Sequence, residues 1–151
     1  MLNAQNPRDL KDPLRLFVYG SLMEGFFNYR KSLEGKVISR TAGKVRGILY
    51  HQKCKGYPAI VPGDGWVSGE VLEFDDFNKA IQICDEIEEY LCPNHPENQY
   101  ERRISGVELA NGTKSSAWVY WYNRNDLGSP ENPVIPILSG NWREFMELKS
   151  P

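Results

Sequence analysis

Short apolar segments divided by turn-forming residues, rather than long helices, make up most of this 151-residue chain. The breaks between them contain glycine and proline, as in Lys55-Gly56. The segments typical of β-strands are residues 14–19, 43–50, 58–61, 66–74, 102–109 and 115–122. Few of them are separated by a helix long enough to cross a sheet. The sequence therefore favours an α+β fold with a closed or strongly curved antiparallel sheet over a doubly wound parallel sheet.

Turn-forming residues define the positions of the later strands and of the connections between them. Asn111-Gly112 tolerates the positive φ angles of a tight turn and predicts a hairpin between residues 102–109 and 115–122. The second of these strands is apolar on both faces, which is typical of a central strand that is covered on both sides. Residues 128–136 are rich in proline, asparagine and glycine and predict a surface connection. Residues 62–65, with the sequence Pro-Gly-Asp-Gly, predict a break between two strands.

Charge and composition narrow the class of protein. The formal net charge is −2, and neither sign collects in a long block, so a nucleic-acid partner is not expected. Residues 1–13 are polar and contain no apolar run like that of a signal peptide, and no later segment resembles a membrane span. We therefore expect a tail at residues 1–13, a single domain at residues 14–151, a cytoplasmic location and no membrane partner.

The three cysteines do not indicate a disulfide framework or a metal site. Cys54, Cys84 and Cys92 are odd in number and form no Cys-x-x-Cys pair, so reduced thiols are expected. Cys92 and His95 have a Cys-x-x-His spacing, but a zinc site needs three or four ligands. The other histidine, His51, has no ligand-like neighbours in the sequence, so we expect no metal.

One long helix is predicted over residues 76–91, with Asp75 or Asp76 able to cap its first amides. At about 100° per residue, its apolar side chains form one continuous arc that faces the core. Glu88 falls at about 20° from Phe77 on this wheel, inside the apolar arc. Burying the arc therefore carries the Glu88 carboxylate inward.

The other acidic residues of this helix, Asp85, Glu86 and Glu89, lie outside the apolar arc and are expected to be solvated. A buried carboxylate such as that of Glu88 raises its pKa or finds hydrogen-bond partners, and either response suits a general acid/base. The structural alternative is that Glu88 lies at the edge of the arc and pairs with an arginine such as Arg102 or Arg103.

The turn Gly20-Ser21-Leu22 follows a strand and precedes a short helix predicted within residues 25–33. Successive backbone amides in such a turn can form a concave anion site. A phosphate loop is excluded, because Phe26 and Phe27 stand where that motif needs lysine and serine or threonine. A small carboxylate or a developing oxyanion remains as the ligand, and the alternative is an ordinary turn that ends a strand.

Several short pieces occur in a distinctive order and spacing along the chain. They are residues 17–22, Asn28 with Leu33, residues 56–59, 67–71, Asp85-x-x-Glu88, residues 100–103, 117–120 and 140–143. Together they resemble the γ-glutamylcyclotransferase-like (AIG2-like) family, whose diagnostic feature is the combination of a Tyr-Gly-Ser-Leu turn with a helical glutamate. The resemblance spans almost all of residues 14–145 and implies a small, mostly antiparallel β-barrel with flanking helices.

The resemblance also implies a chemistry. Characterised members of the family cyclise γ-glutamyl amines or peptides to 5-oxoproline and release the amine, an intramolecular acyl transfer that needs no metal or cofactor. Carried onto this chain, Glu88 matches the catalytic acid/base. The implied substrate-binding residues are Tyr19, Gly20, Ser21, Leu22, Tyr100 and Tyr120. The expected partner is a small γ-glutamyl substrate, with the oligomeric state open; the alternative is a non-catalytic module of the same fold that binds a small ligand.

The chain departs from the family pattern at a few positions. Tyr29, Cys84, Glu89 and Asn141 replace the histidine, leucine, glycine and aspartate that are usual there, and residues 91–99 resemble an inserted loop. None of these changes removes the glutamate or the turn. Glu89 and the loop leave the identity of the γ-glutamyl substrate open.

Overall fold

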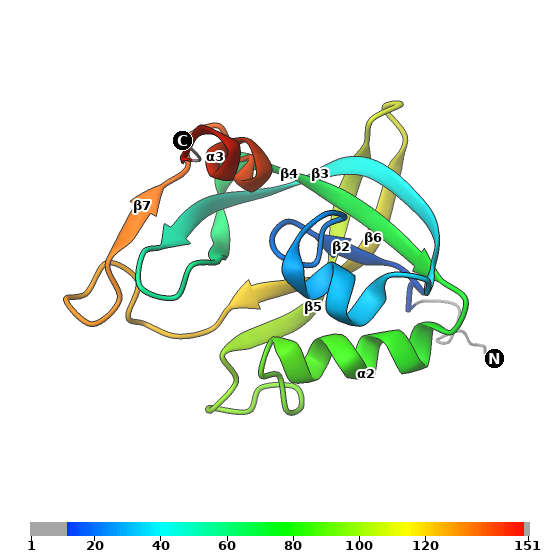
Figure 1. The fold of residues 1–151 in the computed structure, drawn as a ribbon, viewed down its shortest axis with the longest axis horizontal. Coiled ribbons are helices and arrows are strands. Elements are labelled where there is room, and N and C mark those ends of the chain that lie inside the picture. The colour runs from blue at the N-terminus through cyan, green and yellow to red at the C-terminus, as the bar shows by residue number, and fades with distance from the viewer. Residues whose placement is uncertain (1–11, 150–151) are drawn as a thin grey trace.

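Six strands form one sheet that closes on itself in the computed structural model, which describes residues 12–149 (Figure 1). The strands are β2 (Leu16–Val18), β3 (Val37–Gln52), β4 (Pro58–Phe74), β5 (Tyr100–Leu109), β6 (Lys114–Tyr122) and β7 (Val134–Pro136). Their order is β4-β2-β6-β5-β3-β7, and β4 also pairs with β3, so five strands close a barrel and β7 lies outside it. All pairings are antiparallel except that of β2 with β6, which confirms the mostly antiparallel barrel. Of the predicted tail, residues 1–11 lie outside the described residues.

Strands β3 and β4 form one long curved ribbon, and the predicted break at residues 62–65 is wrong. The pairing passes from Arg46 opposite Trp66 to Ile48 opposite Val61, so residues 62–65 form a bulge opposite the single residue Gly47. Such a bulge bends a strand and increases its twist without ending it. The glycine- and proline-rich sequence therefore curves the barrel wall instead of dividing it.

The hairpin between β5 and β6 is confirmed, with residues 110–113 as its loop. Gly112 has a φ of 87°, whereas Asn111 is not among the residues with positive φ, so one residue and not both adopts the left-handed conformation. Strand β6 lies between β2 and β5, as its two apolar faces predict. The predicted connection at residues 128–136 is partly wrong, because β7 pairs there with the end of β3.

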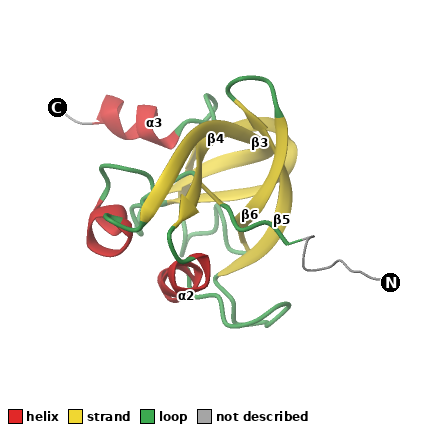
Figure 2. Cartoon of the chain, turned by 90° about the vertical axis from the view of Figure 1, so that its right-hand side faces the viewer, coloured by secondary structure: helices red, strands yellow, loops and turns green. Residues whose placement is uncertain are grey.

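The helices are η1 (Tyr29–Leu33), which is π-helical, α2 (Phe77–Ile87) and α3 (Trp142–Lys149). Helices α2 and α3 lie outside the barrel on different sides of it (Figure 2). The sequence predicted η1 and α2 with longer bounds and did not predict α3, which begins after the Asn141 side chain caps the amide of Glu144. No helix within residues 12–149 is long and apolar enough to cross a membrane.

The barrel interior is a continuous apolar core to which every barrel strand contributes. Its most buried side chains include Leu16, Phe17, Val45, Leu49, Ile60, Val67, Leu72 and Val119. Strand β2, only three residues long, is fully enclosed because it is paired on both edges. The turn that leaves β2 is consequently fixed against the rest of the barrel.

Strand β4 passes so close to β2 that only glycine fits at position 69. A Cβ at Gly69 would overlap the carbonyl oxygen of Val18 and lie 2.7 Å from the ring of Phe17. Because both neighbours belong to the core, we expect Gly69→Ala to lower the free energy of unfolding by roughly 1–3 kcal/mol. Gly106 in β5 has no atom within 4 Å of its would-be Cβ and is the matched control. Urea unfolding of both variants measures the difference, and equal stabilities would contradict it.

Candidate active site

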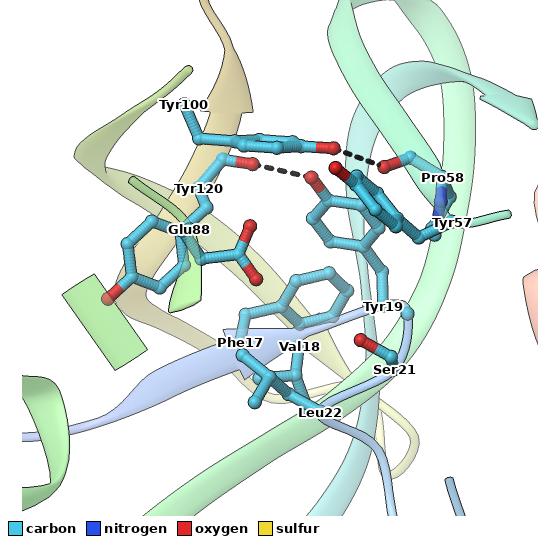
Figure 3. A pocket seen from close by; sticks show the side chains of 11 residues that line it. Phe17, Val18, Tyr19, Ser21, Leu22, Tyr57, Pro58, Glu88, Tyr100 and Tyr120 are labelled. Carbon is cyan, nitrogen blue, oxygen red and sulfur yellow. Dashed lines mark hydrogen bonds between the residues drawn. The ribbon is translucent and has the colours of Figure 1, made fainter. Parts of the chain in front are cut away.

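A hollow of about 30 Å³ opens where β2 ends, between the following turn and the end of α2 (Figure 3). Its lining comes from β2 and the turn that follows it, the loop between β3 and β4 with the first residue of β4, the end of α2, and strands β5 and β6. The lining residues are Phe17, Val18, Tyr19, Gly20, Ser21, Leu22, Tyr57, Pro58, Glu88, Tyr100 and Tyr120. All the residues that the sequence nominated for the site therefore lie around one hollow.

A second hollow, of about 60 Å³, adjoins the first. The two share Ser21, Tyr57, Glu88 and Tyr100 in their linings. The second hollow is completed by Asn28, Ile87, Glu89 and Gln99. Glu88 thus borders both spaces, a position from which one carboxylate can reach two parts of a single small molecule.

The turn after β2 presents backbone amides without protein acceptors. Within the described residues, the N–H groups of Gly20, Ser21 and Leu22 make no hydrogen bond. Other groups of the turn hold it in place: Met23 N–H donates to Gly20 O (2.9 Å), and Asn28 Nδ2 donates to Ser21 Oγ (2.7 Å). Three unpaired donors in succession remain available to an anionic ligand, and the anion site stays a prediction.

Glycine is required at position 20 because the turn packs directly against Pro58, the first residue of β4. A Cβ there would lie 2.7 Å from the Pro58 ring. Sequence reasoning did not nominate Tyr57 or Pro58 for the site. The available signal was the Gly56 turn between two strand segments, since loops that join strands often carry binding residues.

Glu88 lies at the end of α2, one residue beyond its last helical residue, Ile87. The helix closes with a Schellman motif: Tyr90 N–H donates to Asp85 O (2.9 Å), Glu89 N–H donates to Glu86 O (3.3 Å), and Glu89 takes a φ of 55°. At the other end, Asp76 caps the helix through Lys79 N–H, as predicted.

This closure keeps the Glu88 side chain on the core side of α2, where the helical wheel predicted it. Its carboxylate points into the first hollow (Figure 3). The predicted extension of the helix to Leu91 is wrong. Leu91 follows the motif and is 62 % exposed, so it is not part of the apolar arc.

The electrostatic environment opposes ionisation of Glu88. Burial raises the pKa of its carboxyl to about 8, and the negative charges of Asp85 and Glu89 act in the same direction. Within residues 12–149, no side chain or backbone donor pairs with this carboxylate. The alternative pairing with an arginine is wrong, because Arg102 binds Asp85 and Arg103 lies exposed.

Asp85 is not solvated, contrary to the prediction, but is bound by the barrel. Arg102 Nε and Nη2 donate to its two oxygens at 2.9 and 3.1 Å, and Tyr120 Oη donates to Oδ1 at 2.6 Å. The Arg102 guanidinium itself lies between the rings of Tyr90 and Trp118, at 4.9 and 4.6 Å from their centroids. Asp85 therefore attaches the end of α2 to β5 and β6.

Three of the four tyrosines that line the hollow, Tyr19, Tyr100 and Tyr120, have their hydroxyl protons engaged by protein acceptors. Tyr19 Oη donates to Tyr120 O (2.5 Å) and Tyr100 Oη donates to Pro58 O (2.7 Å) (Figure 3). Tyr120 Oη donates to Asp85 Oδ1 (2.6 Å). Burial raises the pKa of all three well above the usual value of 10, so they stay neutral. Among these groups, Glu88 is the one whose pKa lies near neutrality.

The cysteines and histidines lie away from the hollow. All three cysteines are free, with Cys54 and Cys92 exposed and Cys84 buried. His95 Nδ1 accepts from Glu97 N–H, and His51 Nδ1 accepts from Trp142 Nε1. Residues 12–149 contain no group of three His, Cys, Asp or Glu side chains placed to bind a metal ion.

The fold and the hollow define a class: small mixed β-barrels in which the turn after the first strand faces a buried carboxylate at a helix end. A comparison of the sequence with known families identifies the family within that class. Residues 16–144 of the chain match the model of the family described as "Gamma-glutamyl cyclotransferase, AIG2-like", so the chain belongs to this family, as the resemblance predicted.

Relatives of known name agree with this assignment. The chain is 35 % identical, over 86 % of its length and 76 % of the relative's, to the γ-L-glutamyl-butirosin B γ-glutamyl cyclotransferase of Niallia circulans. An AIG2-like protein of Mus musculus superposes with a TM-score of 0.60 and 26 % identity, covering 78 % of this chain and 80 % of that one. YkqA of Bacillus subtilis superposes with a TM-score of 0.60 and 25 % identity over 91 % of this chain, which spans 43 % of YkqA.

Replacing Glu89 by glycine should stabilise the protein. Position 89 has a φ of 55°, where a side chain other than glycine is strained. We expect Glu89→Gly to raise the free energy of unfolding by about 1 kcal/mol. Glu86→Gly, within the last helical turn, is the control and should lower it by a similar amount. Urea unfolding curves decide between these signs.

Glu88 should make the stability depend on pH. Its pKa is about 8 when folded and about 4.5 ordinarily, so between these values the unfolded chain has lost a proton that the folded chain retains. Stability of the wild type should therefore fall as the pH rises through this window, by on the order of a few kcal/mol relative to Glu88→Gln, and should level off above it. Parallel urea titrations of the two proteins across the window measure this; a constant difference would contradict the raised pKa.

Proposed function

We propose that this protein is a γ-glutamylcyclotransferase that converts a γ-glutamyl amine or peptide into 5-oxoproline and the free amine, with Glu88 as general acid/base. One observation carries the proposal: an unpaired carboxylate, with its pKa raised to about 8, lines the same hollow as the turn 20–22, whose three backbone amides make no hydrogen bond. An anion site opposite a proton-transfer group is what a γ-glutamyl substrate requires, because that substrate carries an α-carboxylate and an α-amine on the same carbon.

The reaction is an internal acyl transfer. The substrate's α-nitrogen attacks its own γ-carbonyl carbon and forms the C–N bond of a five-membered lactam, and the original amide C–N bond breaks. Glu88 takes the proton that the attacking nitrogen loses and returns it to the departing nitrogen, so no proton is gained or lost overall. Since both reacting groups belong to one molecule, correct folding of the substrate supplies much of the rate, with effective molarities of about 10⁵ to 10⁸ M in favourable cases.

The pKa of Glu88 suits this two-way transfer. A general acid/base works best when its pKa lies near the working pH, and a carboxyl with an ordinary pKa would be a poor proton donor to a leaving amine. Tyr19, Tyr100 and Tyr120 are less suitable, because their protons are held by protein acceptors. These contacts support Glu88 as the proton-transfer group.

The amides of the turn 20–22 bind the anionic part of the substrate. Tyr19, Tyr100 and Tyr120 form the walls around it. The shape of the site also favours substrate-assisted chemistry over a serine nucleophile. Ser21 Oγ accepts a hydrogen bond from Asn28, and no histidine lines either hollow to act as its base.

The names of the relatives support the reaction type. The Niallia circulans relative is named a γ-glutamyl cyclotransferase of γ-L-glutamyl-butirosin B, and it is 35 % identical to this chain over 130 residues. For this chain we propose a γ-glutamyl amide as the class of substrate and release of the amine as the outcome of the reaction. The group attached to the γ-glutamyl moiety is open.

Replacing Glu88 by glutamine should abolish product formation and leave the fold intact. Glutamine matches the neutral glutamic acid in shape but cannot exchange a proton, so we expect a loss of at least about 10² in kcat. Incubation with a panel of γ-glutamyl amines and dipeptides, followed by mass spectrometry of 5-oxoproline, measures the loss.

Glu86→Gln changes an exposed carboxyl on the same helix and is the control that should retain full activity. Wild-type protein that is thermally stabilised by these compounds, yet releases no 5-oxoproline from any of them, would contradict the cyclotransferase and support a ligand-binding module.

A further inference from the structure

A chain of buried side-chain hydrogen bonds runs from the segment before β7 to the wall of both hollows. It begins at Asp126 and Tyr122, passes through Asn132 and Gln52, and ends at Tyr100. The two amide side chains at its centre belong to residues that are almost wholly enclosed, Gln52 with 0 % and Asn132 with 1 % of their surface exposed. None of these contacts takes part in the proton transfer proposed above.

Gln52 holds two walls of the site at once. Its Nε2 donates to Tyr100 Oη (3.0 Å) and to Tyr57 O (3.3 Å), while its backbone N–H also donates to Tyr57 O (3.1 Å). Tyr57 and Tyr100 both line the two hollows. The amide of Gln52 thus couples the loop between β3 and β4 to strand β5 across the site.

Asn132 fixes which way the Gln52 amide faces. Asn132 Nδ2 donates to Gln52 Oε1 (3.0 Å), so the Gln52 oxygen faces Asn132 and its nitrogen faces Tyr100. Asn132 Nδ2 also lies within hydrogen-bond distance of Tyr122 Oη (3.1 Å) and Asp126 Oδ1 (3.3 Å). Asn132 Oδ1, in contrast, is buried without a partner among the described residues. An unpaired buried acceptor is costly to stability.

The consequence for Tyr100 is a hydroxyl group with one defined direction. It accepts from Gln52 Nε2 and donates its only proton to Pro58 O (2.7 Å). A tyrosine hydroxyl has one donor and two acceptor positions. With the donor and one acceptor position occupied by protein, one lone pair remains for a ligand.

We infer that Gln52 and Asn132 are positioning residues that act through Tyr100: they orient its hydroxyl so that it offers the substrate amine a hydrogen-bond acceptor and no proton. The inference rests on the proposed function, because the amine it serves is the α-amine of a γ-glutamyl substrate. An acceptor at this place orients the N–H bonds of the attacking nitrogen. The lone pair of that nitrogen is thereby directed at the γ-carbonyl carbon of the substrate.

A double-mutant cycle tests the path through Tyr100. Gln52→Met removes the amide at nearly constant volume, and we expect kcat/KM to fall about tenfold in the wild-type background. In a Tyr100→Phe background the hydroxyl is absent, so the same change should cost less than about twofold. Equal losses in the two backgrounds would overturn the inference. Asn132→Asp, which keeps the shape but removes both amide protons, should behave like Gln52→Met.

His51→Leu is the matched control. His51 precedes Gln52 on β3, is equally buried, and pairs with Trp142 of α3 rather than with the site. We expect this variant to lose stability with less than about a twofold change in kcat/KM. A loss as large as that of Gln52→Met would show that the effect is one of general packing and would overturn the inference.

A measurement without substrate separates this inference from the proposed function. In protein labelled with ζ-¹³C-tyrosine, the Tyr100 signal is assigned by its disappearance in Tyr100→Phe. It should shift in Gln52→Met and Asn132→Asp and remain unchanged in His51→Leu. If wild-type protein releases no 5-oxoproline, the proposed function fails, and these shifts still decide whether the two amides orient Tyr100. A Tyr100 signal that does not move in either variant would overturn the orientation.

Discussion

The carboxylate of Asp85 links the last turn of α2 to two strands of the barrel, and the geometry of the hollow follows from this link. Arg102 on β5 donates two N–H groups to it, and Tyr120 on β6 donates its hydroxyl proton. A two-point bond between arginine and carboxylate fixes orientation as well as distance. The end of α2 therefore cannot slide along the barrel without breaking three hydrogen bonds, and Glu88, three residues further on, stays opposite the turn after β2.

The same arrangement places the charge of Glu88 where it is least favourable. Asp85 lies nearby with a negative charge, burial removes water, and the C-terminal end of a helix carries a negative partial charge. Arg102 does not relieve this, because its donors are directed to Asp85 and its plane is stacked between two aromatic rings. A scaffold that holds a carboxyl group in place and opposes its ionisation raises the pKa of that group towards neutral pH.

The sequence predicted the barrel and the inward direction of Glu88, because both depend on local periodicity and on the order of turn signals. Periodicity failed for Asp85, whose partners Arg102 and Tyr120 are distant in the chain and invisible to a helical wheel. Turn signals failed at residues 62–65, where a partner strand continues the pairing on both sides of the bulge. Neither periodicity nor turn signals could reveal the hydrogen bond between the side-chain amides of Gln52 and Asn132, because these residues lie 80 positions apart in the sequence. Contacts between distant parts of the chain, some between polar side chains and some between paired strands, thus account for what the sequence did not show.

The enclosed position of β2 has a consequence for how the molecule is made. Among the described residues this strand is the first to be synthesised, yet one of its neighbours is β6, and Leu16 is paired with Trp118. Pairing over such a separation carries a large loop-closure cost and slows folding. A nascent chain would hold β2 against β4 alone, with one edge unprotected, until the ribosome has released most of the polypeptide. The hollow, whose lining includes Tyr120, therefore cannot form until β6 has been synthesised, and a translation product interrupted before β6 would lack it.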